Sequence, residues 1–156
     1  ENGLEVQAAI LSYGAYDMYT SSLKGFEKMK NFFWLISGSL PRGIFGNNFN
    51  AVDNPEMYKA VSPSFNIPIS SERKLPPQLL TVGSNDKLVT PHSVKVYKEK
   101  LESSGHPAEY WEYQGQGHAF LDSNSNGFLG NNFEVNAPPA LDVMISFLNK
   151  IFYEYH

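Results

Sequence analysis

The feature that most constrains the fold is the alternation of short apolar segments with helical segments in the second half of the chain. Residues 78–83 and 108–113 are apolar or aromatic runs bordered by Pro and Gly, which is typical of buried strands. Between these runs, Thr90 and Pro91 suit the start of a helix, and Gly105 suits its end. Strand, helix and strand in succession predict an α/β fold with a parallel sheet and crossover helices.

Two further segments extend this pattern toward the ends of the chain. The apolar run 6–11, closed by Gly14, predicts a mostly buried strand. Near the other end, Pro138 and Pro139 mark the expected start of a helix with one apolar face. The residues expected on apolar helix faces are Val94, Tyr97 and Leu101 in the helix after Thr90, and Leu141, Met144, Ile145, Leu148, Ile151 and Phe152 in the last helix.

The stretch 18–74 differs in character from the rest of the chain. Apolar and aromatic side chains from Phe26 to Ile36 predict one helix, and residues 54–61 predict a short second helix that Ser62-Pro63 ends. The stretch is too long for a simple connection inside a compact domain, so we expect a lid-like insertion. A helical crossover with a long loop is the alternative.

These patterns predict a single domain over residues 1–156, with a catalytic segment at 75–156 after the lid-like insertion at 18–74. Residues 122–132 are rich in Asn, Ser and Gly and predict a surface loop. An aromatic cluster in the insertion could line a substrate pocket, although aromatics at helical spacing more often belong to a core; its members are Phe26, Phe32, Phe33 and Trp34.

Composition narrows the classes of partner. A formal net charge of −4 without a basic stripe argues against nucleic acid. No apolar run approaches the roughly 18 residues that a membrane span requires. The chain has no cysteine, and its 4 histidines are scattered without metal-ligand spacing, so we expect no metal site. Composition therefore argues against these classes of partner and is compatible with a small-molecule ligand.

Two titratable residues follow the ends of the two best-defined strands. Asp86 comes shortly after the run 78–83, and His118 comes shortly after the run 108–113. Because neighbouring parallel strands end at the same edge of a sheet, we expect these side chains to lie on one rim. An imidazole is the best general base near neutral pH, and a carboxylate on its second nitrogen fixes its tautomer. The spacing therefore favours an acid–base pair.

The segment Leu75 to Phe120 resembles the C-terminal catalytic segment of α/β-hydrolases. A proline-led strand, a G-x-x-D turn ending at Asp86, a crossover helix, a strand and G-x-G-H-x-F around His118 follow one another. The likeness is closest to the hormone-sensitive-lipase-like esterases, which include acetyl esterases. It implies that Asp86 is the catalytic acid and His118 the catalytic base, that the chain is the C-terminal half of such a fold, and that no cofactor takes part.

The nucleophile of this family is not found in the sequence. Such hydrolases carry a G-x-S-x-G elbow ahead of the acid and the base, and the sequence contains neither this motif nor an HGG-type oxyanion motif. The resemblance implies that both lie upstream, in an N-terminal half. We therefore expect an esterase or lipase-like activity on carboxylic esters in the intact protein and inactivity in this chain alone. The strand at 6–11 should pair with that half or with another copy of the chain.

Other candidate residues have plain structural interpretations. Asp17 is a rival for the catalytic acid but better suits a turn or a brace for the insertion. His92 is expected to be exposed at a helix start, and His106 is expected on the surface. Ser84 is better placed to shape the acid-bearing loop than to attack a substrate. Ser39 lacks the strand-to-helix setting of an elbow, and the terminal His156 carries no signal.

Two other functions stay open at this point. Prolyl-oligopeptidase-type serine peptidases have acid and base segments that are similar to these. A non-catalytic binding protein built on a hydrolase fold would also retain such loops while lacking the elbow serine.

Overall fold

The computed structural model describes residues 5–27, 43–46, 48–122 and 132–154. The chain divides into two compact units, one formed by residues 1–14 with 67–156 and the other by residues 15–66. The second unit overlaps the stretch 18–74 that the sequence singles out.

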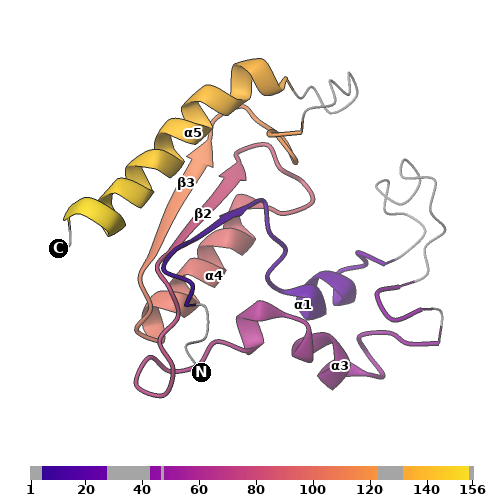
Figure 1. The fold of residues 1–156 in the computed structure, drawn as a ribbon. Helices are drawn as coiled ribbons and strands as arrows, with labels where there is room; N and C mark the ends of the chain where they lie inside the picture. Colours follow the sequence, from indigo (N-terminus) through magenta and orange to yellow (C-terminus); the bar gives the residue numbers. More distant parts are fainter. Residues whose placement is uncertain (1–4, 28–42, 47, 123–131, 155–156) are drawn as a thin grey trace. The chain divides into compact units, whose positions relative to one another are not determined.

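The first unit contains a three-stranded sheet in the order β1-β2-β3, with all strands parallel (Figure 1). The strands are β1 (Ala9–Ser12), β2 (Gln78–Gly83) and β3 (Ala108–Tyr113). The α/β class and the bounds of β2 and β3 are therefore confirmed. The first strand was placed too early, because it begins at Ala9 while Val6 is largely exposed. It is half-buried rather than mostly buried, since in the described part of the chain it pairs with β2 alone.

Helix α4 (Pro91–Ser103) connects β2 to β3 and confirms the helix predicted there. The Thr90 hydroxyl accepts a hydrogen bond from the Ser93 amide and so caps the first turn. Gly105 has a left-handed φ of 83°, the conformation that ends helices and that glycine adopts without strain. The apolar face is buried as expected and consists of Val94, Tyr97 and Leu101.

Helix α5 (Phe133–Asn149) begins earlier than the sequence suggested. We expected Pro138 and Pro139 to mark its first turn, but both prolines lie inside the helix. The helix starts after Asn132, whose side chain accepts from the Val135 amide. A side-chain cap at the N-terminus and burial along the first turns thus outweigh the backbone hydrogen bonds that the prolines remove.

The buried face of α5 also differs from the predicted one. The helix continues into a π-helical turn, η2 (Lys150–Glu154). Among the residues predicted to be buried, Leu141 is 48% exposed, Ile145 is 53% exposed and Phe152 is 39% exposed. The helix instead buries the side chains of Asn136, Ala137, Ala140 and Phe147. Leu141, Ile145 and Phe152, which we call the α5 stripe, therefore face away from the core of this unit.

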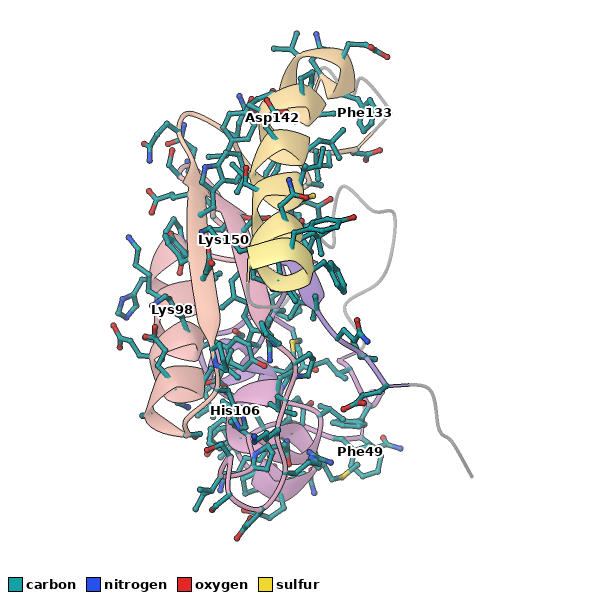
Figure 2. All side chains as sticks on the ribbon, turned by 60° about the vertical axis from the view of Figure 1, so that its left-hand side comes forward. Phe49, Lys98, His106, Phe133, Asp142 and Lys150 are labelled. Atoms are coloured by element: carbon teal, nitrogen blue, oxygen red, sulfur yellow. The ribbon has the colours of Figure 1, made fainter. Side chains whose placement is uncertain are left out.

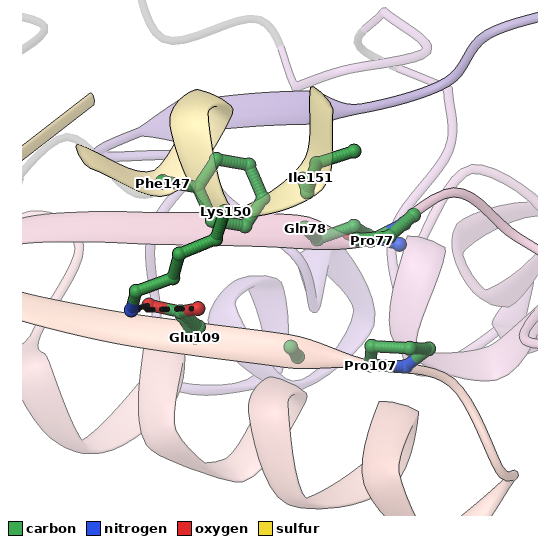
Figure 3. Close-up of a pocket in the computed structure, with 8 residues that line it drawn as sticks. Pro77, Gln78, Pro107, Glu109, Phe147, Lys150 and Ile151 are labelled. Carbon is green, nitrogen blue, oxygen red and sulfur yellow. Dashed lines mark hydrogen bonds and ion pairs between the residues drawn. The ribbon is translucent and has the colours of Figure 1, made fainter. Parts of the chain in front are cut away.

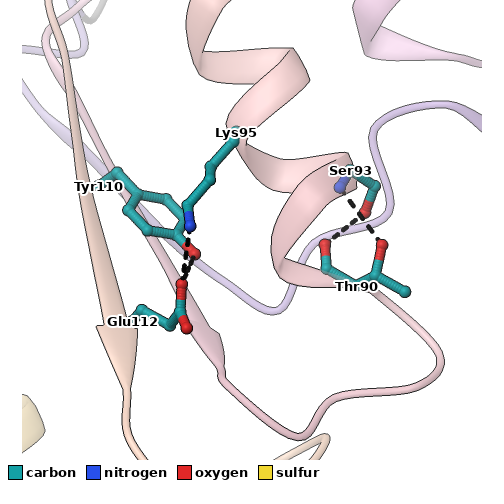
Figure 4. A network of polar contacts seen from close by, with 5 residues as sticks. All are labelled: Thr90, Ser93, Lys95, Tyr110 and Glu112. Atoms are coloured by element: carbon teal, nitrogen blue, oxygen red, sulfur yellow. Dashed lines mark hydrogen bonds and ion pairs between the residues drawn. The ribbon is translucent and has the colours of Figure 1, made fainter.

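Helices α4 and α5 cover opposite faces of the sheet (Figures 1 and 2). Side chains alternate along β3, so Glu109 pairs with Lys150 beyond α5, while Tyr110 and Glu112 face α4. Glu112 accepts from the Tyr110 hydroxyl at 2.6 Å and from the Lys95 ammonium at 3.0 Å (Figure 4). These two hydrogen bonds lower the pKa of Glu112 below its ordinary value.

The second unit contains α1 (Met18–Leu23), α3 (Pro55–Ala60) and a 3-10 turn, η1 (Pro63–Phe65). Helix α3 confirms the short helix expected at 54–61, whereas the sequence reasoning missed α1. The Ser62 hydroxyl links these elements, because it accepts from the Tyr19 amide at 3.1 Å and donates to the Tyr58 carbonyl at 2.7 Å.

The unit also has a buried phenol. The Tyr58 hydroxyl donates to the Glu27 carboxylate at 3.0 Å, and burial together with this carboxylate raises the pKa of Tyr58 to about 12. The helix predicted from Phe26 to Ile36 falls almost entirely outside the described residues, as do the pocket candidates Phe32, Phe33 and Trp34. The loop predicted at 122–132 lies outside them as well, except for its two end residues.

Candidate active site

The carboxylate of Asp86 is held in the loop that follows β2. One oxygen, Oδ1, accepts hydrogen bonds from the backbone amides of Leu88 and Val89, each at 2.9 Å. These two donors are satisfied inside a tight turn, so the loop fixes the direction in which the other oxygen points. The Asp86 side chain is 0% exposed. A buried carboxylate of this kind is costly unless further donors reach it.

His118 supplies that further contact from the loop after β3. Its Nδ1 lies 2.8 Å from Oδ2 of Asp86. With the carboxylate ionised, Nδ1 carries the proton and donates it, and the chemistry of the neutral ring assigns the acceptor role to Nε2. The His118 side chain is 23% exposed, so the imidazole reaches the surface of this unit while Asp86 does not. The two predicted site residues are thus brought together.

Backbone contacts join the two loops that bear these residues. The Asn85 amide donates to the Gln116 carbonyl at 2.8 Å, and the Asn85 side chain donates to the Gly115 carbonyl at 3.1 Å. The Gly115 amide donates in return to the Ser84 hydroxyl at 2.8 Å. Ser84 therefore shapes the junction of the loops, as its position in the sequence suggested.

The approach of the loops is close enough to require glycine at one position. A methyl group on Gly83 would collide with the Gln116 carbonyl and would lie 2.5 Å from the carbonyl oxygen of Gly117. Gly83 is the last residue of β2, so the same residue ends the strand and admits the His118 loop. The sequence identified the glycine as a strand end but gave no indication of this close approach.

Behind His118 the chain is anchored to the core. Phe120 is fully buried, and its carbonyl accepts from the side chain of Asn136 in α5 at 3.1 Å. Ala119, directly after His118, has a left-handed φ of 55°, which is uncommon for a residue other than glycine. The role of Asn136 was missed, because no local pattern connects it to a loop that lies 16 residues away.

Two of the other candidate residues from the sequence lie at the starts of helices. Asp17 caps α1, with its carboxylate oxygens accepting from the Thr20 amide and hydroxyl, both at 2.8 Å. His92 is exposed at the start of α4, as expected. Ser39 and His156 lie outside the described residues.

The prediction for His106 was wrong, because this residue is 2% exposed rather than on the surface. Its Nε2 donates to the Pro68 carbonyl at 2.7 Å, and its Nδ1 accepts from the Leu75 amide at 3.3 Å. The imidazole is buried because both ring nitrogens satisfy backbone groups of the 67–75 segment. No signal near His106 in the sequence could reveal these distant partners.

A cavity of about 330 Å³ lies at the opposite end of the strands (Figure 3). It opens beside the starts of β2 and β3, whereas Asp86 and His118 follow the ends of these strands. Its lining is mostly apolar, with the Lys150–Glu109 ion pair beside it. The cavity is lined by Pro77, Gln78, Pro107, Ala108, Glu109, Phe147, Lys150 and Ile151.

Among the residues that the structure describes, no group of three or more His, Asp or Glu side chains is arranged to hold a metal ion. None of the helices in the same ranges combines the length and apolar character needed to cross a bilayer.

The solved structures that are similar to this chain include a thermophilic esterase, Est2, from the Planctomycetes species Thermogutta terrifontis. The native form superposes with a TM-score of 0.57 at 20% identity, covering 96% of this chain and 44% of the esterase. Its butyrate-bound form gives a TM-score of 0.59 at 20% identity, with 96% and 45% covered. The form phosphonylated by sarin gives 0.60 at 20% identity, with 94% and 45% covered. The chain thus spans less than half the length of these structures.

Sequence comparison identifies the family. No curated protein matched the chain. The family model of the prolyl oligopeptidase family matches residues 7–130, which is most of the sequence. The narrower likeness to hormone-sensitive-lipase-like esterases stays a prediction. Because of the family match, together with the parallel sheet and its structural neighbours, this chain belongs to the prolyl oligopeptidase family and has an α/β-hydrolase fold.

Proposed function

We propose that this chain supplies the acid and the base of a serine hydrolase that cleaves carboxylic esters. The observation that carries the proposal is the 2.8 Å contact between Nδ1 of His118 and Oδ2 of a fully buried Asp86. A carboxylate in this position keeps the imidazole in the tautomer that a general base needs and stabilises the imidazolium formed during reaction.

In the proposed reaction, a serine outside this chain attacks the ester carbonyl, and Nε2 of His118 takes the hydroxyl proton. The tetrahedral intermediate collapses when His118 returns that proton to the departing alcohol, which leaves an acyl-enzyme. Water then attacks the acyl group and gives its proton to His118. His118 passes this proton to the serine oxygen as the second intermediate collapses, which frees the acid and regenerates the serine hydroxyl. Asp86 stays ionised throughout and orients the ring. No metal or organic cofactor has a role in these steps.

We propose a small acyl group for the substrate. The similar Thermogutta terrifontis esterase has been solved with butyrate bound, and this supports a short-chain ester as the first substrate to test. The family name supports a peptidase as the second candidate, in which the same residues would hydrolyse a peptide bond. The two candidates share the acid and the base, so substrate tests must separate them.

We further propose that the partner of this chain is the half of the hydrolase fold that carries the nucleophile. Two features of the described residues support this. The outer edge of β1 has no strand beside it within the described residues, and the α5 stripe exposes Leu141, Ile145 and Phe152. An exposed strand edge and an exposed apolar helix face both favour association. The solved esterases are more than twice as long as this chain, which supports a covering segment of similar size.

The test compares the full-length protein with its His118→Ala variant on p-nitrophenyl butyrate and on a prolyl p-nitroanilide peptide. We expect ester cleavage that falls about 10⁴-fold to 10⁶-fold in the variant. We also expect a fluorophosphonate probe to label the folded full-length protein but not the denatured protein. Ester cleavage unchanged by His118→Ala would refute the base, and cleavage of the peptide alone would favour the peptidase. Absence of labelling and of both activities would favour a non-catalytic binding protein.

The partner is tested by mixing this chain with a separately expressed N-terminal half. We expect a 1:1 complex that gains esterase activity. Leu141→Asp and Ile145→Asp should weaken the complex. Asp142→Asn on the same helix should not, because Asp142 does not belong to the α5 stripe. A homodimer that excludes the N-terminal half would contradict the proposed partner.

A further inference from the structure

Tyr13 occupies a strained backbone position at the end of β1. Its φ is 43°, in the left-handed region that residues other than glycine rarely adopt. Its amide nevertheless donates to the Thr81 carbonyl at 2.7 Å, which continues the ladder between β1 and β2 by one residue. Such strain persists only where the surrounding structure fixes the residue, and it concentrates at functional sites.

The conformation of Tyr13 brings its ring against the proposed base. The ring meets the His118 imidazole edge-on, with centroids 5.3 Å apart and planes at 60°. It also meets Phe120 edge-on, with centroids 5.3 Å apart and planes at 85°. Tyr13 therefore contacts both the imidazole and the buried residue that anchors its loop, whereas Asp86 holds the imidazole by a single nitrogen.

We infer that Tyr13 is a positioning residue for His118, whose aromatic ring restricts rotation of the imidazole so that Nδ1 keeps facing Asp86. The orientation of the ring is argued from geometry alone, and only its catalytic use rests on the proposed function. Rotation about the Cβ–Cγ bond of histidine is soft, so packing against Tyr13 adds a restraint to the Nδ1 contact with Asp86. The edge-on contact with Tyr13 favours the observed orientation over those in which a ring carbon would face the carboxylate.

The phenol itself is suited to this place. Burial, and to a smaller extent the negative charge of Asp122, raise the pKa of Tyr13 above its ordinary value. The hydroxyl therefore stays protonated at neutral pH, and Tyr13 places no second anion beside the imidazole. Asp86 remains the carboxylate in contact with Nδ1, which is the arrangement that a single tautomer requires.

The test uses nuclear magnetic resonance on the full-length protein with ¹⁵N-labelled histidine. His118 is assigned from the signals lost in His118→Gln, and its tautomer is determined from its ring nitrogen shifts. We expect one tautomer, protonated at Nδ1, in the wild type and in Tyr13→Phe. In Tyr13→Ala the second tautomer should rise, and exchange of the Nδ1 proton with water should accelerate by about 2-fold to 12-fold, the range that one aromatic contact represents.

Tyr113→Ala is the matched control. Tyr113 packs edge-on against Phe120 at the same 5.3 Å centroid distance and otherwise stacks on Trp111, so its removal perturbs the same aromatic cluster. We expect its His118 signals to match those of the wild type. If Tyr13→Ala does not fold, Tyr13→Leu, which keeps bulk without an aromatic edge, takes its place with the same expected result.

Wild-type signals in Tyr13→Ala or its Leu substitute overturn the inference, and so does an equal loss in Tyr113→Ala. A wild type without a protonated Nδ1 also overturns it, because there is then no orientation to hold. Failure of the proposed function has a different signature. In that case ester cleavage is absent from the full-length protein while the dependence of the His118 signals on Tyr13 persists.

Discussion

Gly83 lies so close to the His118 loop that a methyl group on its α-carbon would lie 2.5 Å from the carbonyl oxygen of Gly117. The end of the central strand and the loop that bears the proposed base are therefore in backbone contact. Any side chain at position 83 has to move the loop, because the obstructing atoms belong to the backbone and cannot rotate away. A displaced loop would carry His118 with it, and we therefore expect the contact with Asp86 to change.

Gly83→Ala should destabilise the chain by about 1–3 kcal/mol through overpacking and should impair ester cleavage by the full-length protein. Denaturant unfolding and kcat/KM measure the two effects. Gly117→Ala is the matched control, because a methyl group there meets nothing within 4 Å, and we expect a change within about 0.5 kcal/mol. Equal effects of the two substitutions would contradict the close approach.

Asp86→Asn should leave the fold intact but remove the correct tautomer. The amide oxygen can still accept from Leu88 and Val89, while the amide nitrogen would donate to Nδ1 and move the ring proton to Nε2. Loss of the correct tautomer costs about 10⁴ in kcat in serine proteases with the same substitution. Steady-state kinetics of the full-length protein measure this loss.

Asp17→Asn separates the rival acid from Asp86. Because Asp17 caps α1, this variant should lose no more than about 1 kcal/mol of stability and keep its kcat. A large loss of kcat in Asp17→Asn, with Asp86→Asn unaffected, would exchange the roles of the two residues.

His106→Ala should destabilise the chain by about 2–3 kcal/mol, because it leaves the Leu75 amide and the Pro68 carbonyl without their buried partner. Its effect on kcat should be small, since the imidazole serves the 67–75 segment. The comparison is His92→Ala, which should change stability by less than about 0.5 kcal/mol because His92 is exposed. Thermal unfolding of both variants provides the measurement.

Asn136→Ala should cost about 1–3 kcal/mol, since the buried Phe120 carbonyl loses its donor. Because Phe120 lies two residues after His118, we also expect lower kcat with little change in KM. Asn149→Ala, on the exposed side of the same helix, should leave both quantities near the wild-type values. A kcat unaffected by Asn136→Ala would show that α5 does not hold the His118 loop.

Alkaline pH should destabilise the unit formed by residues 15–66 through Tyr58. Its pKa rises from 10.0 to about 12 on folding, so the folded unit retains a proton that the unfolded chain loses. The free energy of unfolding contributed by this group is therefore complete below pH 10 and falls, by up to about 2 kcal/mol, as the pH rises toward 12. Hydrogen exchange of this unit across that range, compared with Tyr58→Phe, measures the contribution. A slope retained in Tyr58→Phe would assign it to another group.

The parts of the fold that could be predicted from the sequence are those specified by neighbouring residues. β2, β3 and α4 carry their own caps, turn residues and apolar periodicity, so their bounds followed from local rules. The proximity of Asp86 and His118 could also be anticipated, because parallel neighbouring strands end at one edge of a sheet.

The features that escaped prediction depend on contacts between distant residues. His106 is buried by carbonyl and amide groups more than 30 residues away, and Asn136 supports a loop that precedes α5. The start of α5 escaped prediction because Pro138 and Pro139 resemble the first turn of a helix, whereas the side chain of Asn132 caps the helix six residues earlier. Tyr13 meets His118 only because β1 lies in the same sheet, and no sequence spacing encodes that encounter.

The division into two units has a consequence for how such a protein can be altered. Asp86, His118 and the residues that hold them all belong to one unit, while residues 15–66 form their own core. Changes within residues 15–66 and changes in the two loops that carry Asp86 and His118 therefore fall in different structural units. The two sets of residues could then diverge at different rates in evolution.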